Sequence, residues 1–407
     1  MTAEPGKRTD VVQPADHDQP HDLPAAGRLS PLVGRVLGGP HAHARIARID
    51  GWRAKALPGV VAVLISDDVL DTDPYHGLFV EDRPLMAIDR TRFVGEPVAA
   101  VAAEDPTVAA HARTLIDVTY EELPAAPTLD AALADGAPRL HLTELLRPGI
   151  LHGPTDWTGH RGNVCWRQRA ATGDVAAAFA GADLIVAGEY DIARGAPAPV
   201  VPPPIVADWT DSSLTIWTAS PEPFLPRAKL ARIFDLPLDR VRIIVTPGCD
   251  PGARNDGLSV APIAAALARK AKRPVRLEAS PGESPLTAAW PGARVGMRTA
   301  ATAAGRLLAR EVRVDLDLGA FAGDHPLRID PAPVLGPYRW QAVAFEAQGV
   351  YTNTPPNTAS SPLLPAIGEL QVDEIARRLG RDALEVRTQN LLASIVSSPA
   401  STLVRRS

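Results

Sequence analysis

The pattern of apolar and polar positions predicts short strands and helices that alternate along most of the chain. In the first third, the alternation across residues 44–49 and the β-branched run at 60–65 predict two strands around a short helix. A helix over 106–115 is predicted between two further strands, and Pro124 ends the second of them. These elements predict a compact α/β unit.

The remaining pattern predicts a second and larger unit. Asp174 is placed to cap an alanine-rich helix that ends at Gly181, and residues 211–213 are expected to turn a hairpin. A helix over 260–271 ends in a basic cluster at 269–273, which suits the negative end of the helix dipole. Strands are predicted at 184–190, 241–245, 307–318 and 342–351, and helices at 226–234, 368–379 and 383–391.

Length and composition indicate a folded protein of more than one domain. The chain has 407 residues, of which 45% are hydrophobic and 22% charged, and these values are typical of globular proteins. The mixture of strands and helices predicts the α+β class, with mixed α/β units. A net charge of −5 gives no broad positive field, so neither nucleic acid nor an anionic membrane surface is expected as a partner.

The cysteines and the terminal segments bear on disulfides, metal sites and cellular location. Cys165 and Cys249 are the only cysteines and form no CxxC pair, so neither a disulfide framework nor a cysteine-ligated zinc or iron–sulfur site is expected. Residues 1–27 lack the apolar core of a signal peptide, and no apolar stretch in the sequence is long enough to span a membrane. We expect a cytoplasmic protein with a disordered tail at 1–27 and a frayed end at 394–407.

Four features could carry chemistry, but each has a structural explanation that we prefer. His41 and His43 would face one side of a predicted strand, yet no further zinc ligand is near in the sequence. The acidic loop at 67–73 lacks the glycine and the terminal glutamate of an EF-hand. Glu96 is expected to serve a turn, and Cys249 has no adjacent histidine that would activate it.

Several motifs carry a family resemblance. GGPHAHARIARID at 38–50 and RFVGEPVAAVAAED at 92–105, followed by EVRVDLDLGAFAG at 311–323 and VYTNTPP at 350–356, resemble the xanthine dehydrogenase and aldehyde oxidase family of molybdenum hydroxylases. The resemblance runs from Leu32 to Leu392. The domains that it implies are an α/β hammerhead domain over 28–142, a linker over 143–160 and a first molybdopterin-binding domain over 161–393.

This resemblance implies a specific chemistry. In the family, a molybdenum centre on a pterin dithiolene carries a hydroxide that attacks an aldehyde or an N-heterocycle, and a glutamate acts as general base. Electrons leave through iron–sulfur clusters and flavin on other domains or subunits. The resemblance therefore implies molybdopterin and molybdenum as the family's cofactors, and neither an iron–sulfur cluster nor FAD in this chain.

The first family segment for the metal site departs from the family pattern. The family has a Gln, His and Glu-Pro series here, whereas this chain has Gly195, Pro197 and Val201-Pro202. Glycine and valine offer no side-chain donor or acceptor, and proline also lacks a backbone N–H. This segment is not expected to hydrogen-bond an oxo ligand as the family does.

The second segment is the glycine-rich loop that cradles the cofactor in the family. Here it reads TPGCDPGARNDG, and Gly248 and Gly252 keep some backbone freedom. Asp250 puts a negative charge where an anionic cofactor would lie, and Pro251 removes a donor. Cofactor binding in the family manner is therefore not expected at this loop.

The third segment follows YTNTPP, where the family has an arginine and a phenylalanine that orient the substrate. Ser361 stands in place of the arginine, and Leu363 lies near the phenylalanine position. The family's general base belongs to its second molybdopterin-binding domain, and the chain is expected to end before that domain. The sequence thus predicts no catalytic, cofactor-binding or metal-ligating residue.

Three hypotheses remain open from the sequence. The chain is a degenerate relative that acts as an interaction or scaffold subunit, or one part of a split molybdenum hydroxylase paired with a second cofactor-domain chain, or the product of a decaying gene. Under the first two, other subunits of a molybdenum-hydroxylase complex or a second copy are the expected partners. Exposed apolar surface is expected where a second cofactor domain would pack.

Overall fold

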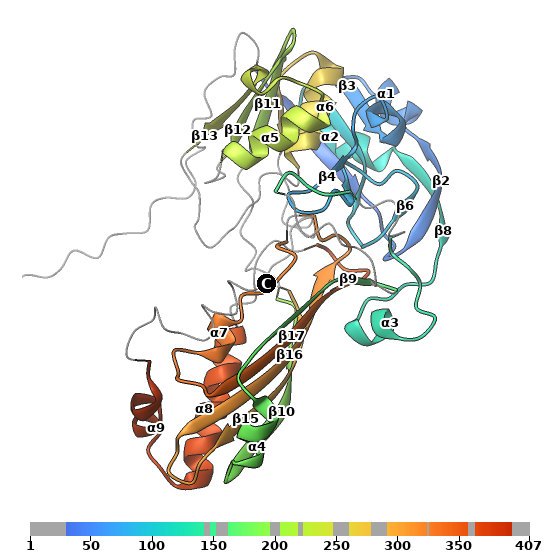
Figure 1. The fold of residues 1–407 in the computed structure, drawn as a ribbon. Coiled ribbons are helices and arrows are strands. Elements are labelled where there is room, and N and C mark those ends of the chain that lie inside the picture. The colour runs from blue at the N-terminus through green and yellow to red at the C-terminus, as the bar shows by residue number, and fades with distance from the viewer. Residues whose placement is uncertain are drawn as a thin grey trace, which may run out of the picture.

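The computed structural model describes residues 30–141, 147–151, 162–195, 204–218, 223–246, 260–277, 291–323, 325–356 and 363–392. These residues form two lobes, one around a seven-stranded sheet and the other around a five-stranded sheet (Figure 1). The predicted tails at 1–27 and 394–407, and the predicted linker apart from 147–151, lie outside the described residues. No helix of the described residues is long and apolar enough to cross a membrane.

The seven-stranded sheet joins strands that are far apart in the chain. Its order is β13-β12-β11-β14-β1-β7-β3. The strands are β1 (Leu32–Gly38), β3 (Val60–Ile65), β7 (Pro97–Ala103), β11 (Ile205–Thr210), β12 (Ser213–Thr218), β13 (Val241–Val245) and β14 (Val275–Leu277). Because β1 pairs in parallel with β14, strands from the predicted hammerhead range and from the predicted second domain share one sheet.

Alternating side chains of β7 pack helices onto the two faces of this sheet. Ala100 and Ala102 lie in one core with α6 (Ala261–Ala271), whereas Ala99, Val101 and Ala103 lie in another with α2 (Pro106–Thr114). Every residue of β7 is buried, and its small side chains allow helices to approach closely on both sides. The short helix α1 (Trp52–Ala56) packs on β3, and α5 (Phe224–Ile233) packs on β13.

Smaller elements complete this lobe. A three-stranded sheet has the order β6-β2-β8, and β4 pairs with β5. These elements are β2 (Ala44–Asp50), β4 (Tyr75–His76), β5 (Arg83–Pro84), β6 (Arg90–Thr91), β8 (Asp117–Glu122) and the 3-10 helix η1 (Ser66–Val69). The following helix, α3 (Leu129–Leu133), packs on β17 of the second lobe.

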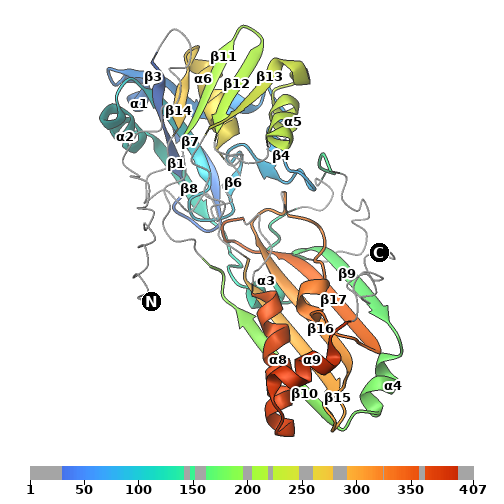
Figure 2. The same ribbon diagram turned by 90° about the vertical axis from the view of Figure 1, so that its left-hand side faces the viewer.

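Helix α8 covers one face of the five-stranded sheet of the second lobe, and α4 packs on the opposite face at one end of the sheet. The strand order of this sheet is β10-β15-β16-β17-β9, and Figure 2 shows α8 and α9 lying across it. The elements are β9 (Val164–Thr172), α4 (Val175–Ala180), β10 (Leu184–Ile192), β15 (Ala293–Ala301), β16 (Leu307–Gly319), α7 (Ala332–Leu335), β17 (Ala342–Tyr351), α8 (Leu364–Leu379) and α9 (Ala383–Asn390).

The structure confirms most predicted elements and corrects two of them. The Asp174 side chain accepts a hydrogen bond from Ala177 N and caps α4 as predicted. Helix α8 begins at Leu364 instead of Gly368 because Pro365 fits a first turn, and Leu364 and Ile367 extend its buried face. His41 and His43 precede β2 instead of lying on a strand, since the chain bends after Gly39-Pro40.

Candidate functional site

Four strand ends meet at one edge of the seven-stranded sheet. Ile205 pairs with Leu277, Val206 with Trp217, and Thr218 with Val245. The start of β11 and the ends of β12, β13 and β14 therefore lie together. Each of them adjoins residues that lie outside the described part of the chain, at 196–203, 219–222, 247–259 and 278–290.

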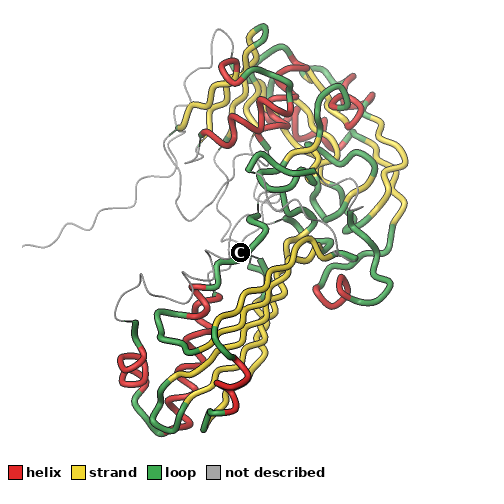
Figure 3. The backbone as a smooth tube through the Cα atoms, viewed as in Figure 1, coloured by secondary structure: helices red, strands yellow, loops and turns green. Residues whose placement is uncertain are grey.

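The five-stranded sheet has a matching edge. Ile192 pairs with Ala293, Ala293 with Leu316, and Leu316 with Gly349, so the ends of β10, β16 and β17 lie together. The chain passes between the two edges twice, from β10 to β11 and from β14 to β15. We call the region between these edges the junction, and Figure 3 shows that loops make up much of what is described there.

Arg194 joins two segments at the junction. Its Nη2 lies 3.2 Å from Asp317 Oδ1, and its Nη1 donates to the carbonyl of Pro355. Asp317 Oδ1 also accepts from Gly319 N and from Thr352 Oγ1. The residue that follows β10 is thus bound to the chain that follows β16 and β17.

The structure describes one of the six predicted site positions. Gly195 follows Arg194 and is half-buried. The Arg194–Pro355 hydrogen bond brings the segment of Gly195 close to the segment that continues toward position 361. The other five positions, which are Pro197, Val201, Gly248, Gly252 and Ser361, lie outside the described residues.

A buried polar cluster ties the two lobes beside the junction, and it was not found from the sequence. Asp82 Oδ2 accepts hydrogen bonds from Ala322 N at 2.7 Å and from Tyr351 Oη at 2.8 Å. Cys165 Sγ donates to Tyr351 Oη at 3.2 Å. Burial raises the pKa of Cys165 and of Tyr351, so the thiol stays protonated and is not a nucleophile.

The YTNTPP motif contributes further bonds between the lobes. Asn353 Oδ1 accepts from Ala126 N at 2.7 Å, and its Nδ2 donates to the carbonyls of Ala42 and Arg92. Close by, His141 Nε2 lies 2.6 Å from the carbonyl of Ala320. Burial lowers the pKa of His141 to about 3, so its ring is neutral. In the described structure this motif therefore holds the lobes together.

The two histidines noted in the sequence have structural partners. His41 Nδ1 lies 3.1 Å from Glu122 Oε1, and His43 Nδ1 lies 2.6 Å from the carbonyl of Pro124. Among the described residues, no group of three or more His, Cys, Asp or Glu side chains could hold a metal ion. This arrangement agrees with the structural interpretation of the pair.

The acidic loop and the basic end of α6 bind each other. Lys270 Nζ lies 2.5 Å from Asp68 Oδ1, and Arg269 Nη2 lies 2.7 Å from Asp71 Oδ2. Arg147 from another segment pairs with Asp73. Asp68, Asp71 and Asp73 of the acidic loop therefore each have a basic partner.

Glu96 lies in the buried turn that was predicted for it. Its side chain accepts from Arg92 N, while its Oε1 has no hydrogen-bond partner within the described structure. Burial raises the pKa of Glu96 to about 7, against the opposing effect of Arg92. Cys249, the other single residue noted in the sequence, lies outside the described residues.

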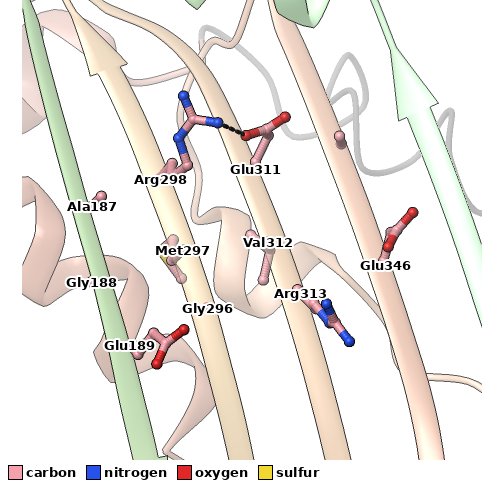
Figure 4. A pocket seen from close by; sticks show the side chains of 11 residues that line it. Ala187, Gly188, Glu189, Gly296, Met297, Arg298, Glu311, Val312, Arg313 and Glu346 are labelled. Atoms are coloured by element: carbon pink, nitrogen blue, oxygen red, sulfur yellow. Dashed lines mark hydrogen bonds and ion pairs between the residues drawn. The ribbon is translucent and has the colours of Figure 1, made fainter.

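The open face of the five-stranded sheet is hollowed and carries charged side chains. A depression of about 680 Å³ crosses β10, β15, β16 and β17 (Figure 4). Arg298 and Glu311 form an ion pair of 2.8 Å within it, and Arg169 pairs with Glu346 beside it. These charged side chains lie on the face of the mixed sheet that is opposite the core packed against α8.

Two family models cover most of the described chain. The molybdopterin cofactor-binding domain matches residues 158–391, and the aldehyde oxidase and xanthine dehydrogenase a/b hammerhead domain matches residues 21–124. The chain belongs to the molybdenum-hydroxylase large-subunit family. Both the suspected family and the expected α+β architecture are thereby confirmed.

Relatives of this family differ in how much of their length the chain spans. It is 30% identical to a probable xanthine dehydrogenase subunit of Bacillus subtilis over 371 residues, which are 88% of this chain and 47% of that protein. It is 31% identical to the nicotinate dehydrogenase large molybdopterin subunit of Eubacterium barkeri over 364 residues, which are 86% of this chain and 79% of that subunit.

A solved structure has the same fold. Quinoline 2-oxidoreductase from Pseudomonas putida 86 superimposes with a TM-score of 0.76 at 31% identity, over 91% of this chain and 47% of that one. The chain therefore spans about half the length of this enzyme chain and of the Bacillus relative.

Proposed function

We propose that this chain is a molybdopterin-binding-type subunit that keeps its family's fold, does not itself hold the molybdenum cofactor, and acts by binding other subunits of a molybdenum-hydroxylase complex. The observation that carries the proposal is the residue types in the first family segment, of which Gly195 lies at the junction. Gly195, Pro197 and Val201 supply no side-chain donor or acceptor where the family has three polar residues.

The donor set does not fit an anionic pterin cofactor. The charge of Arg194, the described cation next to Gly195, is balanced by Asp317, and its Nη1 is bound to the carbonyl of Pro355. In the glycine-rich loop, Asp250 adds a negative charge and Pro251 removes a donor. No step of the family reaction is therefore assigned to this chain.

The surrounding scaffold supports a role that needs only the fold. The two lobes stay joined by the hydrogen bonds of Asp82 and Asn353. Within the first lobe, the seven-stranded sheet joins strands from both predicted domains. Relatives are named as parts of assemblies, such as a xanthine dehydrogenase subunit, a large molybdopterin subunit and a complex subunit gamma. A chain that binds such a partner needs these hydrogen bonds and this strand pairing even if it binds no cofactor.

The test is metal and pterin analysis of the purified protein. The chain is expressed in a host that makes the cofactor, both alone and together with the products of its neighbouring genes, and molybdenum and released pterin are measured. We expect a stable complex without molybdenum. The nicotinate dehydrogenase large subunit, prepared identically with its own partners, is the control for cofactor loading. Near-stoichiometric molybdenum in either preparation of this chain would overturn the proposal.

A second candidate is a split enzyme. The match to 79% of a protein named as one large molybdopterin subunit favours it, because such a chain works with others. A separate chain would then supply the remaining cofactor contacts and the general base. This candidate predicts molybdenum in the complex together with oxidation of an aldehyde or an N-heterocycle, and it fails if a tightly bound partner copurifies without the metal.

A further inference from the structure

A cavity of about 470 Å³ lies on the side of the hammerhead elements that faces the second lobe. One wall comes from residues 73–75, 81–82 and 89–92, and the other from 139–141 and Arg147. Its volume falls within the ~300–1,000 Å³ that is usual for small-molecule sites. The family motifs at the junction do not contribute to it.

Positive charge exceeds negative charge at one end of this cavity. Arg90 and Arg92 share a single carboxylate, Asp89, at 2.7 and 3.8 Å. Arg92 Nε also donates to the carbonyl of Leu140, which places the neighbouring Arg139 at the same end. Arg139 is exposed and forms no ion pair or hydrogen bond with the described residues. Of the carboxylates that line the cavity, Asp89 is the one that pairs with Arg90 and Arg92, and none pairs with Arg139.

At the opposite end of the cavity, the charged side chains form ion pairs with one another. Arg147 pairs with Asp73 at 2.7 Å and with Glu81 at 3.4 Å, and Glu81 also pairs with Arg232 at 2.9 Å. Two carboxylates and two guanidinium groups therefore balance each other there. Asp82, the remaining carboxylate of the lining, accepts hydrogen bonds from Ala322 N and Tyr351 Oη. The end with Arg139 is therefore the end that offers a positive charge to a ligand.

The lining between the two ends is partly apolar. Pro74, Tyr75 and Leu140 provide ring and aliphatic surface, while His141 is neutral. With Nε2 bound to Ala320, the Nδ1 atom of His141 remains as a hydrogen-bond acceptor. The lining therefore suits a molecule with an anionic group at one end and an apolar or aromatic body.

We propose that this cavity binds a small carboxylate with an apolar or aromatic body, whose carboxylate is held by Arg139 together with Arg92 and Arg90. A guanidinium group matches the two oxygens of a carboxylate in a forked geometry. None of the residues that line the cavity is one of the six positions that depart from the family pattern, and the proposal does not depend on whether the chain holds molybdenum.

The full chain is titrated with benzoate by isothermal titration calorimetry, and benzamide serves as the neutral isostere. We expect saturable binding of benzoate at one site and none of benzamide. Arg139→Gln should weaken benzoate binding about tenfold, because a charge-assisted hydrogen bond is lost. Arg139 is exposed, so this variant is expected to fold.

Arg306→Gln is the matched control. Arg306 is an exposed arginine in the turn between β15 and β16 that forms no ion pair or side-chain hydrogen bond with the described residues, and its removal should leave benzoate binding unchanged. Absence of benzoate binding, equal binding of benzamide, or equal weakening by Arg139→Gln and Arg306→Gln would each overturn the proposal. Equal weakening by the two variants would mean that benzoate is attracted by the overall positive charge and not by a site at Arg139.

Discussion

Arg310 and Gly195 lie in the same lobe, but their surroundings differ. Arg310 is fully buried between the five-stranded sheet and α8, where it donates to Thr299 Oγ1 and to the carbonyls of Val334 and Gly368. Its guanidinium carbon also lies 4.7 Å from the ring centre of Trp340. Gly195 lies at the junction, and the family resemblance aligns it with a polar residue.

This difference separates two kinds of constraint on a sequence. A change at Arg310 leaves buried acceptors without partners, and folding free energy is lost at once. A change at a position that only contacts a ligand has no such cost. Under the proposed function, a chain that no longer binds cofactor can lose its ligand contacts while the packing around Arg310 is retained.

The largest expected effect is that of replacing the buried Arg310. Arg310→Met should lower the free energy of unfolding by about 3 kcal/mol, because several buried acceptors lose a charged donor together. Urea denaturation measures it, with Arg306→Met as the exposed control, which should change the value by less than about 0.5 kcal/mol. Equal small effects would mean that the Arg310 network does not stabilise the lobe.

Glu96, a buried carboxylate in the other lobe, makes the free energy of unfolding depend on pH. The folded state raises the pKa of Glu96 from 4.5 to about 7 by burial, so the folded protein binds more protons than the unfolded chain between these values. The stabilisation is complete below about pH 4.5 and is lost as the pH rises through 7, by on the order of 3 kcal/mol.

Glu96→Gln isolates this contribution. Urea denaturation of both proteins between pH 5 and pH 8 should show the unfolding free energy of the wild type falling relative to that of the variant. Other titrating groups cancel in the difference. Parallel curves would mean that Glu96 is not protonated in the folded protein.

A smaller effect is expected where the lobes meet. Tyr351→Phe keeps the ring against His141 but removes the hydroxyl that donates to Asp82 and accepts from Cys165. The free energy of unfolding should fall by about 1–2 kcal/mol. Tyr120→Phe is the matched control, because the Tyr120 hydroxyl has no hydrogen bond within the described structure. If both variants lose the same free energy of unfolding, the hydrogen bond to Asp82 does not stabilise the fold.

The sequence predicted elements better than it predicted their pairing. Strands β13 and β17 have the bounds that their β-branched and aromatic patterns predict. The pattern did not predict β9 and β15 as strands, because exposed charged residues and glycines interrupt their apolar runs. Nor could local pattern predict that β1 pairs with β14, since that register depends on a partner distant in the chain.

The candidate site was predictable only as a set of residue types. Gly195 and Ser361 were found from the sequence because a family pattern names those positions. The Asp82–Tyr351 bond and the Arg194–Asp317 pair join residues far apart in the sequence. No spacing rule connects such residues, because only the packing of the lobes brings them together.

The smallest expected effect tests the junction itself. Gly195→Gln should change the free energy of unfolding by less than about 0.5 kcal/mol, since Gly195 is half-buried and a glutamine can extend its side chain toward solvent. The variant should also acquire no molybdenum, because one donor does not replace the three altered segments. Denaturation and metal analysis measure the two outcomes.

Gly319→Ala is the control that gives this result its meaning. Gly319 lies near the same arginine, but its φ is +71°, and a Cβ atom there would lie 2.3 Å from the carbonyl oxygen of Pro355. Alanine should therefore cost about 2 kcal/mol or more. If Gly195→Gln costs as much as Gly319→Ala, the backbone at position 195 requires glycine. Glycine at position 195 would then be required for folding. The comparison of Arg310, which the fold requires, with Gly195, which the fold would not require, would be wrong.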